Sequence, residues 1–240
     1  MSVFRSHILL QKTSNLKVLP QECAWDMPKR NYQNHFNFFI LCLETTNSEF
    51  MTAKEALKQL KDGNRRYVKG ELKHPHTDNQ RRDEVADSQH PFAVILSCAD
   101  SRVVPELLFD QGLGDLFVIR VAGNVAKDKV FGSIEYAVKF LNSKLIVVLG
   151  HENCGAVNAS LGDADPGGHI GSIIDRIKPA VYMARRMEGD LLTNAIKVNA
   201  QIVGEELKET KPIISDAVKN AGVEVYSAYY KLSTGEVEFL

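Results

Sequence analysis

Two short segments of this chain carry side chains whose types and spacing could bind one metal ion. In the first, Cys98, Asp100 and Arg102 stand at alternate positions, and in the second, His151 precedes Cys154 by three residues. Two thiolates and one imidazole are a ligand set with which zinc leaves its fourth position open to water. An open position predicts a catalytic metal site and not a structural one.

Each segment follows directly on a short, continuously apolar run. Residues 92–96 lead into Cys98, and residues 145–149 lead into His151. If both runs are strands of one parallel sheet, their carboxyl ends meet where ligands usually collect in such folds. Cys154 is then expected at the start of a helix, where the helix dipole favours a thiolate.

Taken singly, each residue of the pattern has a structural interpretation. A cysteine after a strand is usually a small core residue, and a histidine after glycine is usually part of a turn. Asp100 could be a helix cap and Arg102 a surface charge. Five such side chains at the ends of neighbouring strands are hard to explain in this way, so the joint pattern favours a metal site.

The charges of this site predict a mechanism. A zinc ion with two thiolates and a neutral imidazole carries no net charge, and the water it binds becomes a nucleophile. Thiolates donate more charge than imidazoles do, so we expect activity to rise into the alkaline range. Asp100, paired with Arg102, is expected to orient the water. Released from Arg102, Asp100 is close enough to Cys98 in the chain to become a fourth ligand and switch the site off.

The surrounding pattern predicts an α/β fold. Apolar runs at 92–96, 116–119 and 145–149 alternate with helical segments, which is typical of a mostly parallel sheet covered by helices on both faces. Thr52 and Glu55 form a capping box before a helix. Further helices are expected near residues 79–87, 133–141, 155–161, 170–187 and 191–210, and a hairpin or paired extended segment over 223–232 and 236–240.

Composition excludes several classes of protein. The chain has 240 residues, 44% of them hydrophobic, and a formal net charge of -1, so it has no basic field for nucleic acid. No apolar run is long enough to span a membrane. The four cysteines are not those of a small secreted scaffold, so we expect a reducing compartment and a cytoplasmic protein.

Residues 1–50 differ from the remainder, which we take as one catalytic domain over residues 51–240. They show no sustained period and hold the single tryptophan, Trp25, and two of the four cysteines. Three interpretations stay open. The segment is an irregular extension packed on the domain or on a partner subunit, a targeting segment, or an upstream stretch that is not part of the working protein.

The two metal-binding segments, read over residues 98–103 and 151–156, together resemble the β-class carbonic anhydrases. The paired motifs are specific, although neither half alone would be. The resemblance runs from about residue 51 to the C-terminus and is supported by the stretches 114–120, 122–124 and 132–138.

The resemblance implies the reversible hydration of carbon dioxide to bicarbonate and a proton. It implies Zn²⁺ held by Cys98, His151 and Cys154, with Asp100 and Arg102 as a catalytic pair. It also implies a sheet of four parallel strands with an added edge strand. A homodimer is the minimal unit that it implies, often assembled into tetramers, with the active cleft at the subunit interface.

Two substrate-binding groups also follow from the resemblance. The backbone N–H of Gly155 is expected to help hold bicarbonate, and Gln111 is the candidate for a substrate-side amide. Family members often place that glutamine before a Pro-Gly turn, whereas this chain has one extra residue and no proline there. Gln111 therefore also has an interpretation as a solvated turn residue. Val121 stands where an asparagine is common.

Two other functions are compatible with this sequence. A related zinc hydrolase would act at the same site on a CO2-like molecule such as carbonyl sulfide or carbon disulfide. A non-catalytic zinc scaffold or bicarbonate sensor would need neither Asp100 nor Arg102, so their presence argues against it. His74, His76 and His169 could serve as proton shuttles, but a solvated loop explains His74 and His76 better and a helix start explains His169 better, so we assign them no role.

Overall fold

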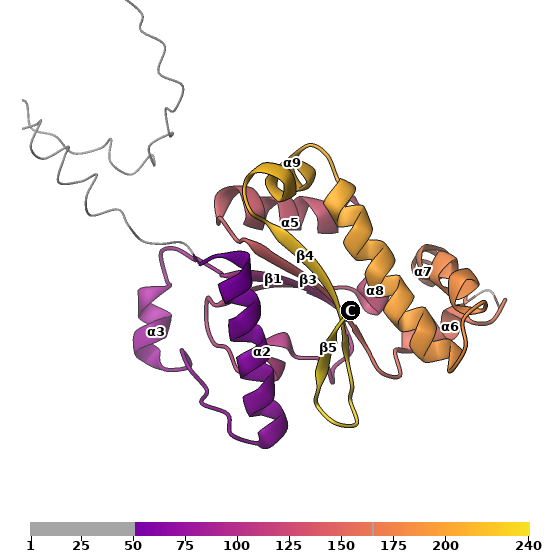
Figure 1. The fold of residues 1–240 in the computed structure, drawn as a ribbon, viewed down its shortest axis with the longest axis horizontal. Helices are drawn as coiled ribbons and strands as arrows, with labels where there is room; N and C mark the ends of the chain where they lie inside the picture. Colours follow the sequence, from indigo (N-terminus) through magenta and orange to yellow (C-terminus); the bar gives the residue numbers. More distant parts are fainter. Residues whose placement is uncertain (1–50, 165) are drawn as a thin grey trace, which may run out of the picture. The chain divides into compact units, whose positions relative to one another are not determined.

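The fold rests on a computed structural model that describes residues 51–164 and 166–240. The sequence-based interpretations of residues 1–50 lie outside the described residues. Within the described part of the chain, five strands form one sheet in the order β2-β1-β3-β4-β5 (Figure 1). The strands are β1 (Ala93–Ser97), β2 (Leu116–Arg120), β3 (Leu145–His151), β4 (Glu224–Tyr230) and β5 (Val237–Phe239).

The sheet confirms the predicted topology. Strands β2, β1, β3 and β4 are parallel, and β5 is added antiparallel to β4. Every residue of β1 and β3 is buried, which explains why these two strands read as continuous apolar runs. The register sets Ser97, the last residue of β1, beside Leu149 of β3 and Arg120 of β2. The segments that follow β1 and β3 therefore emerge at the same end of the sheet.

Helices cover both faces of the sheet (Figure 1). One face packs against α5, α8 and α9 through a core that includes Ile134, Val203 and Ile214. The other packs against α2 and α4 through Leu60 and Leu108. The helices are α2 (Ala53–Lys69), α3 (Asn79–Glu84), α4 (Pro105–Leu108), the 3-10 turn η2 (Ala122–Asn124), α5 (Asp128–Phe140), α6 (Gly155–Ser160), α7 (Ile170–Ala184), α8 (Leu191–Glu209) and α9 (Ile213–Asn220).

Most predicted elements are present, with shifts at their ends. The capping box at Thr52 and Glu55 forms as expected and starts α2. Helix α5 begins at Asp128, five residues before the predicted start at Ser133. The predicted start is too late because Gly132 is a poor helix former and the sequence pattern places it outside the helix. The sequence analysis missed α4, η2 and α9, which are too short to show a clear period.

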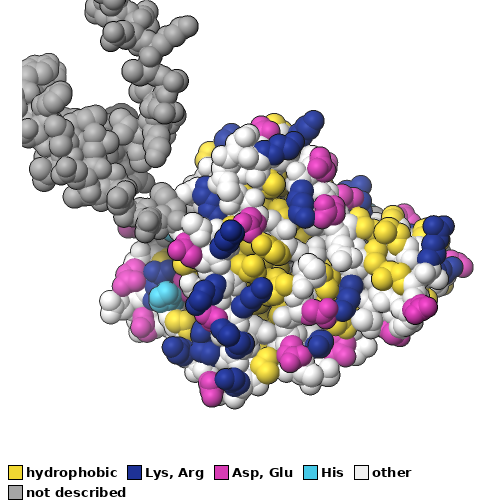
Figure 2. All heavy atoms as spheres, in the orientation of Figure 1, with side chains coloured by type: hydrophobic (Ala, Val, Ile, Leu, Met, Phe, Trp, Pro, Cys, Tyr) yellow, Lys and Arg dark blue, Asp and Glu magenta, His cyan; other side chains and the backbone are white. Residues whose placement is uncertain are grey.

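The surface mixes charges and apolar groups. Figure 2 shows Lys and Arg side chains gathered over the region of α2, with acidic side chains between them. A groove of about 710 Å³ beside this helix is lined by Lys54, Lys58, Lys61 and Arg65 together with Phe239 of β5. Among the residues that the structure describes, no helix is both long and apolar enough to cross a membrane.

Candidate metal centre

Cys98, His151 and Cys154 meet at the carboxyl ends of β1 and β3. Their ligand atoms all lie within 4.8 Å of one another. Cys98 follows β1, His151 is the last residue of β3, and Cys154 caps the start of α6. All three are buried, and the two cysteines pack among apolar residues of α6, α7 and α8. The parallel pairing of β1 with β3 therefore brings together residues that stand more than fifty positions apart.

His151 is oriented so that one ring nitrogen faces the two thiols. Its Nδ1 lies 2.9 Å from the carbonyl oxygen of Glu152, which can only accept, so Nδ1 carries the hydrogen. Nε2 is fully buried and has no hydrogen-bond partner within the described part of the chain. A buried nitrogen lone pair without a partner costs free energy unless a ligand uses it. The donor set and this unpartnered atom fit a metal ion.

The two thiols shift each other's pKa in opposite directions. The Cys154 thiol is the main cause that lowers the pKa of Cys98 to about 4, and His151 and the N–H of Gly123 contribute to the lowering against the effect of burial. The same contact with Cys98, together with burial, raises the pKa of Cys154. One sulfur is thus ready to carry the negative charge that a cation requires.

Asp100 and Arg102 form a two-pronged ion pair beside these ligands. Arg102 donates from Nε to Oδ1 at 2.9 Å and from Nη2 to Oδ2 at 2.8 Å. The backbone N–H of Arg102 also donates to Oδ1. These bonds, the guanidinium bond first, hold the pKa of Asp100 well below its usual range. Oδ2 lies 3.9 Å from Nε2 of His151, so the carboxylate faces the ligand cluster.

Two further residues hold the ligand segments, and the sequence analysis assigned neither a role. Arg120, at the end of β2, donates to the carbonyl oxygens of Cys98 (3.1 Å) and Asp100 (2.6 Å). The carboxylate of Glu152 accepts from the backbone N–H of Ser233 in the β4–β5 turn. The register of β2 beside β1 is the signal that could have placed Arg120 near Cys98.

Gln111 lies in a different polar network. Its side-chain oxygen accepts from Gln59 of α2 at 2.9 Å, and its amide nitrogen donates to the carbonyl of Phe109 at 2.7 Å. The residue is buried and follows shortly after α4 in the chain. Both of these side-chain bonds are made within the chain, and its role toward a substrate stays a prediction.

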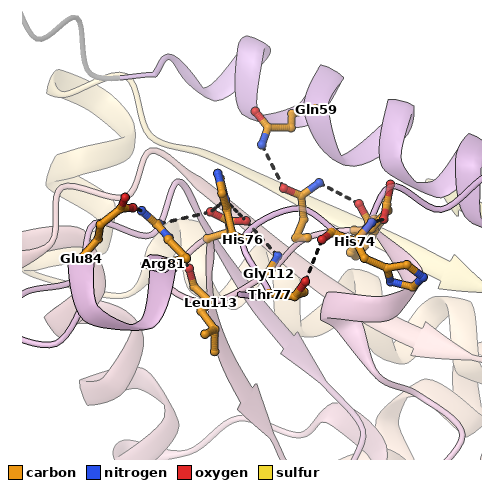
Figure 3. A network of polar contacts seen from close by, with 12 residues as sticks. Gln59, His74, His76, Thr77, Arg81, Glu84, Gly112 and Leu113 are labelled. Carbon is orange, nitrogen blue, oxygen red and sulfur yellow. Dashed lines mark hydrogen bonds and ion pairs between the residues drawn. The ribbon is translucent and has the colours of Figure 1, made fainter. Parts of the chain in front are cut away.

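Asp110 and Asp115 complete this network, part of which Figure 3 shows (Gln59, His76, Arg81 and Gly112 are labelled). Asp110 accepts from Arg66 and from the backbone N–H groups of Lys73 and His74. Asp115 accepts from the backbone N–H of Gly112 and lies 2.8 Å from Nδ1 of His76. We call Asp110, Gln111, Asp115 and the groups bonded to them the turn network.

Gly155 is the first residue of α6, next to Cys154. It is exposed, and a side chain added there would meet no atom within 4 Å. The space beside its backbone is therefore open, and its role with bicarbonate stays a prediction. His169 is the N-cap residue of α7 and so lies at a helix start, in agreement with the structural interpretation of this residue.

Comparison with protein families and curated sequences gives a consistent result. The family model described as carbonic anhydrase matches residues 93–237. Carbonic anhydrase 2 of Mycobacterium tuberculosis is 43% identical over 187 residues, which cover 75% of this chain and 89% of the relative. The carbonic anhydrase of Mycolicibacterium smegmatis is 42% identical over 190 residues, or 76% of this chain and 91% of the relative.

Solved structures agree in fold. A Coccomyxa β-carbonic anhydrase in complex with acetazolamide aligns with a TM-score of 0.60 at 30% identity, covering 66% of this chain and 75% of that one. One of two tetrameric β-carbonic anhydrases from Sordaria macrospora aligns with a TM-score of 0.62 at 22% identity, covering 85% and 97%. At that lower identity the likeness speaks for the fold alone.

Proposed function

This chain belongs to the β-class carbonic anhydrases, and from that premise we propose that it hydrates CO2 reversibly to bicarbonate and a proton at a zinc ion held by Cys98, His151 and Cys154. The observation that carries the proposal is the buried Nε2 of His151, which has no hydrogen-bond partner among residues 51–164 and 166–240 and lies near two thiols and an ionised carboxylate. Two sulfurs and one imidazole nitrogen are ligands that zinc favours. When bound there, zinc would supply the Lewis acidity that turns water into a nucleophile near neutral pH.

Asp100 is proposed to orient the attacking water. Because Arg102 keeps the pKa of Asp100 far below neutrality, the carboxylate is ionised throughout the working pH range and can only accept hydrogen bonds. Its Oδ2 is the oxygen nearer His151 and accepts from Nη2 of Arg102, which limits its rotation. An acceptor fixed in this position holds the O–H of a water and turns its lone pair toward a substrate.

Arg102 is also proposed to set the state of the site. Its side chain is 53% exposed, whereas that of Asp100 is 17% exposed, so the arginine is the freer partner of the pair. If it swings into solvent, Asp100 loses both side-chain bonds and becomes available as a fourth ligand. Asp100 would then occupy the position at the zinc ion that water needs, and the site would be inactive.

The remaining assignments rest on the family. Gly155, whose backbone borders open space, is proposed to donate its N–H to bicarbonate, and Gln111 is kept as a proposed substrate-side amide. We propose a homodimer or a tetramer in the cytoplasm, with residues 51–240 as the catalytic domain. The β-carbonic anhydrases of Sordaria macrospora are tetrameric, which supports an oligomer here.

Stopped-flow CO2 hydration by the purified full chain tests the proposal. We expect activity that a chelator removes and zinc restores, with one zinc per chain and a rate that rises with pH above neutrality. A rate already level by pH 6 would contradict the expected effect of two thiolate ligands. Release of sulfide from carbonyl sulfide without CO2 hydration would favour the related hydrolase instead.

A further inference from the structure

The thiol of Cys98 receives a hydrogen bond from the backbone. The N–H of Gly123 in η2 lies 3.2 Å from Sγ of Cys98, and the sulfur is buried. A backbone N–H aimed at a thiolate stabilises its negative charge, and in a dry environment this effect is stronger than in water. It also reduces the charge that the sulfur donates to a metal ion. The direction of this N–H therefore affects the Lewis acidity of a metal ion bound to Cys98.

That direction depends on an unusual backbone conformation. Gly123 has φ +68° and ψ +17°, and the next residue, Asn124, also has a positive φ of 45°. A side chain at position 123 would meet Cδ1 of Ile177 at 2.7 Å and Cβ of Ala156 at 3.2 Å. Glycine adopts a positive φ readily and asparagine tolerates one, so this turn is not strongly strained, but glycine also adopts many other conformations and the surrounding structure must select this one.

A buried amide from α8 supplies that hold. Nδ2 of Asn199 donates to the carbonyl oxygen of Gly123 at 2.8 Å, and Asn199 is only 2% exposed. One turn to either side of it, Ala195 and Val203 are buried and apolar. A polar side chain on such a face is unfavourable unless it makes its hydrogen bonds. The amide therefore ties the peptide that joins Gly123 to Asn124 to a rigid helix.

The loop between η2 and α5 is also held by a side chain. Nε of Arg176, on α7, donates to the carbonyl of Ala126 at 3.1 Å, and the same guanidinium forms an ion pair with Glu206 of α8. Helices α7 and α8 thus support the loop at two separate points. Asn199 is the support that lies one peptide away from the bond to Cys98.

The geometry points to Asn199 as a positioning residue for the metal centre: by fixing the Gly123 carbonyl, it keeps the Gly123 N–H directed at Sγ of Cys98. This inference rests on the proposed function, since it concerns how strongly Cys98 donates to the ion. Asn199 touches neither the ion nor a substrate. Its loss is expected to let the peptide that joins Gly123 to Asn124 shift, and with it the φ and ψ angles of Gly123, so that the Gly123 N–H turns away from the sulfur.

Nuclear magnetic resonance of the full chain loaded with ¹¹³Cd tests this directly. A hydrogen bond from an amide to a metal-bound sulfur transmits a coupling between the amide proton and the cadmium nucleus. We expect this coupling at the Gly123 amide of the wild type and its loss in Asn199→Leu, which keeps the branching of the side chain at Cγ but has no donor. In the Co²⁺-loaded variant, the sulfur-to-cobalt charge-transfer band is expected to move to longer wavelength.

Asn64→Leu is the matched control. Asn64 is also a buried helical asparagine, and its Nδ2 donates to the carbonyls of Leu108 and Gly235, on the side of the sheet that packs against α2. Its replacement should lower stability but leave the Gly123 coupling and the cobalt band unchanged. In Asn199→Leu with zinc, kcat is expected to fall about 10-fold while KM stays near the wild-type value.

Two results would overturn the inference: no coupling at Gly123 in the wild type, or an undiminished coupling in Asn199→Leu. If Asn199→Leu takes up no metal, Asn199→Ser is compared with the wild type in its place. The serine side chain is too short for its hydroxyl to reach the Gly123 carbonyl. A wild type with the coupling but without CO2 hydration would contradict the proposed function and still support the role of Asn199 toward Cys98.

Discussion

The metal centre and the turn network are built from similar side chains but differ in what those side chains bond to. Both combine histidine, aspartate and arginine. In the turn network, the carboxylates of Asp110 and Asp115 accept from backbone N–H groups and pair with arginine side chains of the chain itself. In the metal centre, Nε2 of His151 has no partner in the part of the chain that the structure describes. A saturated network stabilises a fold, whereas an unsaturated buried group marks a place for a ligand.

The position of each region in the sheet agrees with this contrast. The metal centre follows β1 and β3 and so lies at the carboxyl end of the parallel strands. Asp115 directly precedes β2, and its carbonyl accepts from Phe92, directly before β1, so the turn network lies at the amino end. Ligands of open α/β sheets collect at the carboxyl end. Composition alone therefore does not separate a site from a support, but bonding and position do.

The largest expected effect comes from removing a ligand. The Cys154→Ser variant should no longer bind one zinc per chain, and its rate of CO2 hydration should fall. The fall should exceed roughly 100-fold, which is the upper effect of removing a residue that only supports a metal ligand. Metal analysis after dialysis and stopped-flow kinetics measure both quantities. A variant with full zinc occupancy would show that Cys154 is not a ligand and would remove the contrast between the two regions.

Removing Asp110 from the turn network should affect stability and not chemistry. The side chain of Asp110 is fully buried, so Asp110→Ala leaves Arg66 and two backbone N–H groups without their acceptor. We expect a loss of about 3 kcal/mol in the free energy of unfolding, measured with urea. Zinc content and kcat of the folded variant should match the wild type, and a loss of zinc would show that the two regions are coupled.

The same aspartate predicts a pH dependence of stability. Burial alone would raise the pKa of Asp110, but bonds from Arg66, Lys73 and His74 outweigh it and lower the pKa below its usual value. A lowered folded-state pKa stabilises the protein above the unfolded-state value of about 3.9, and this contribution is lost as the pH falls through the folded-state pKa. Urea unfolding between pH 7 and pH 3 should show a smaller acid loss for Asp110→Ala than for the wild type.

A smaller effect is expected from the carboxylate that orients water. Asp100→Asn should retain zinc but lower kcat about 10- to 100-fold. An amide is uncharged and cannot form the two-pronged ion pair with Arg102, and its NH2 group is a donor where the carboxylate has an acceptor. Asp115→Asn is the matched control in the turn network and should leave kcat unchanged. Equal kinetics of Asp100→Asn and the wild type would exclude the proposed role of Asp100.

The smallest effect is expected at the exposed edge of the turn network. The His76 side chain is 49% exposed, so its pair with Asp115 is screened by water. His76→Gln should lower the free energy of unfolding by about 0.5 kcal/mol and leave CO2 hydration unchanged. A change in kcat would mean that His76 takes part in proton transfer, a role that the sequence analysis left unassigned.

The sequence by itself determined the strands and the ligand candidates. The strands β1 and β3 can be recognised in the sequence as continuous apolar runs because both are buried on both faces. The residues that follow them can be placed near one another because parallel strands end at the same edge of the sheet. The added antiparallel strand followed from the resemblance and is present. The short helices α4, η2 and α9 were missed because none of the three shows a clear hydrophobic period in the sequence.

Only the tertiary structure decided which groups support the site and which are used up elsewhere. Asn199 reaches Gly123 across 76 positions, and Gln111 finds Gln59 across 52, and neither contact leaves a trace in local spacing. Sequence periodicity reports burial and backbone preference, which are local properties. Hydrogen bonds between distant elements depend on how helices pack on the sheet, so the partners of Cys98 and Gln111 emerge only in three dimensions.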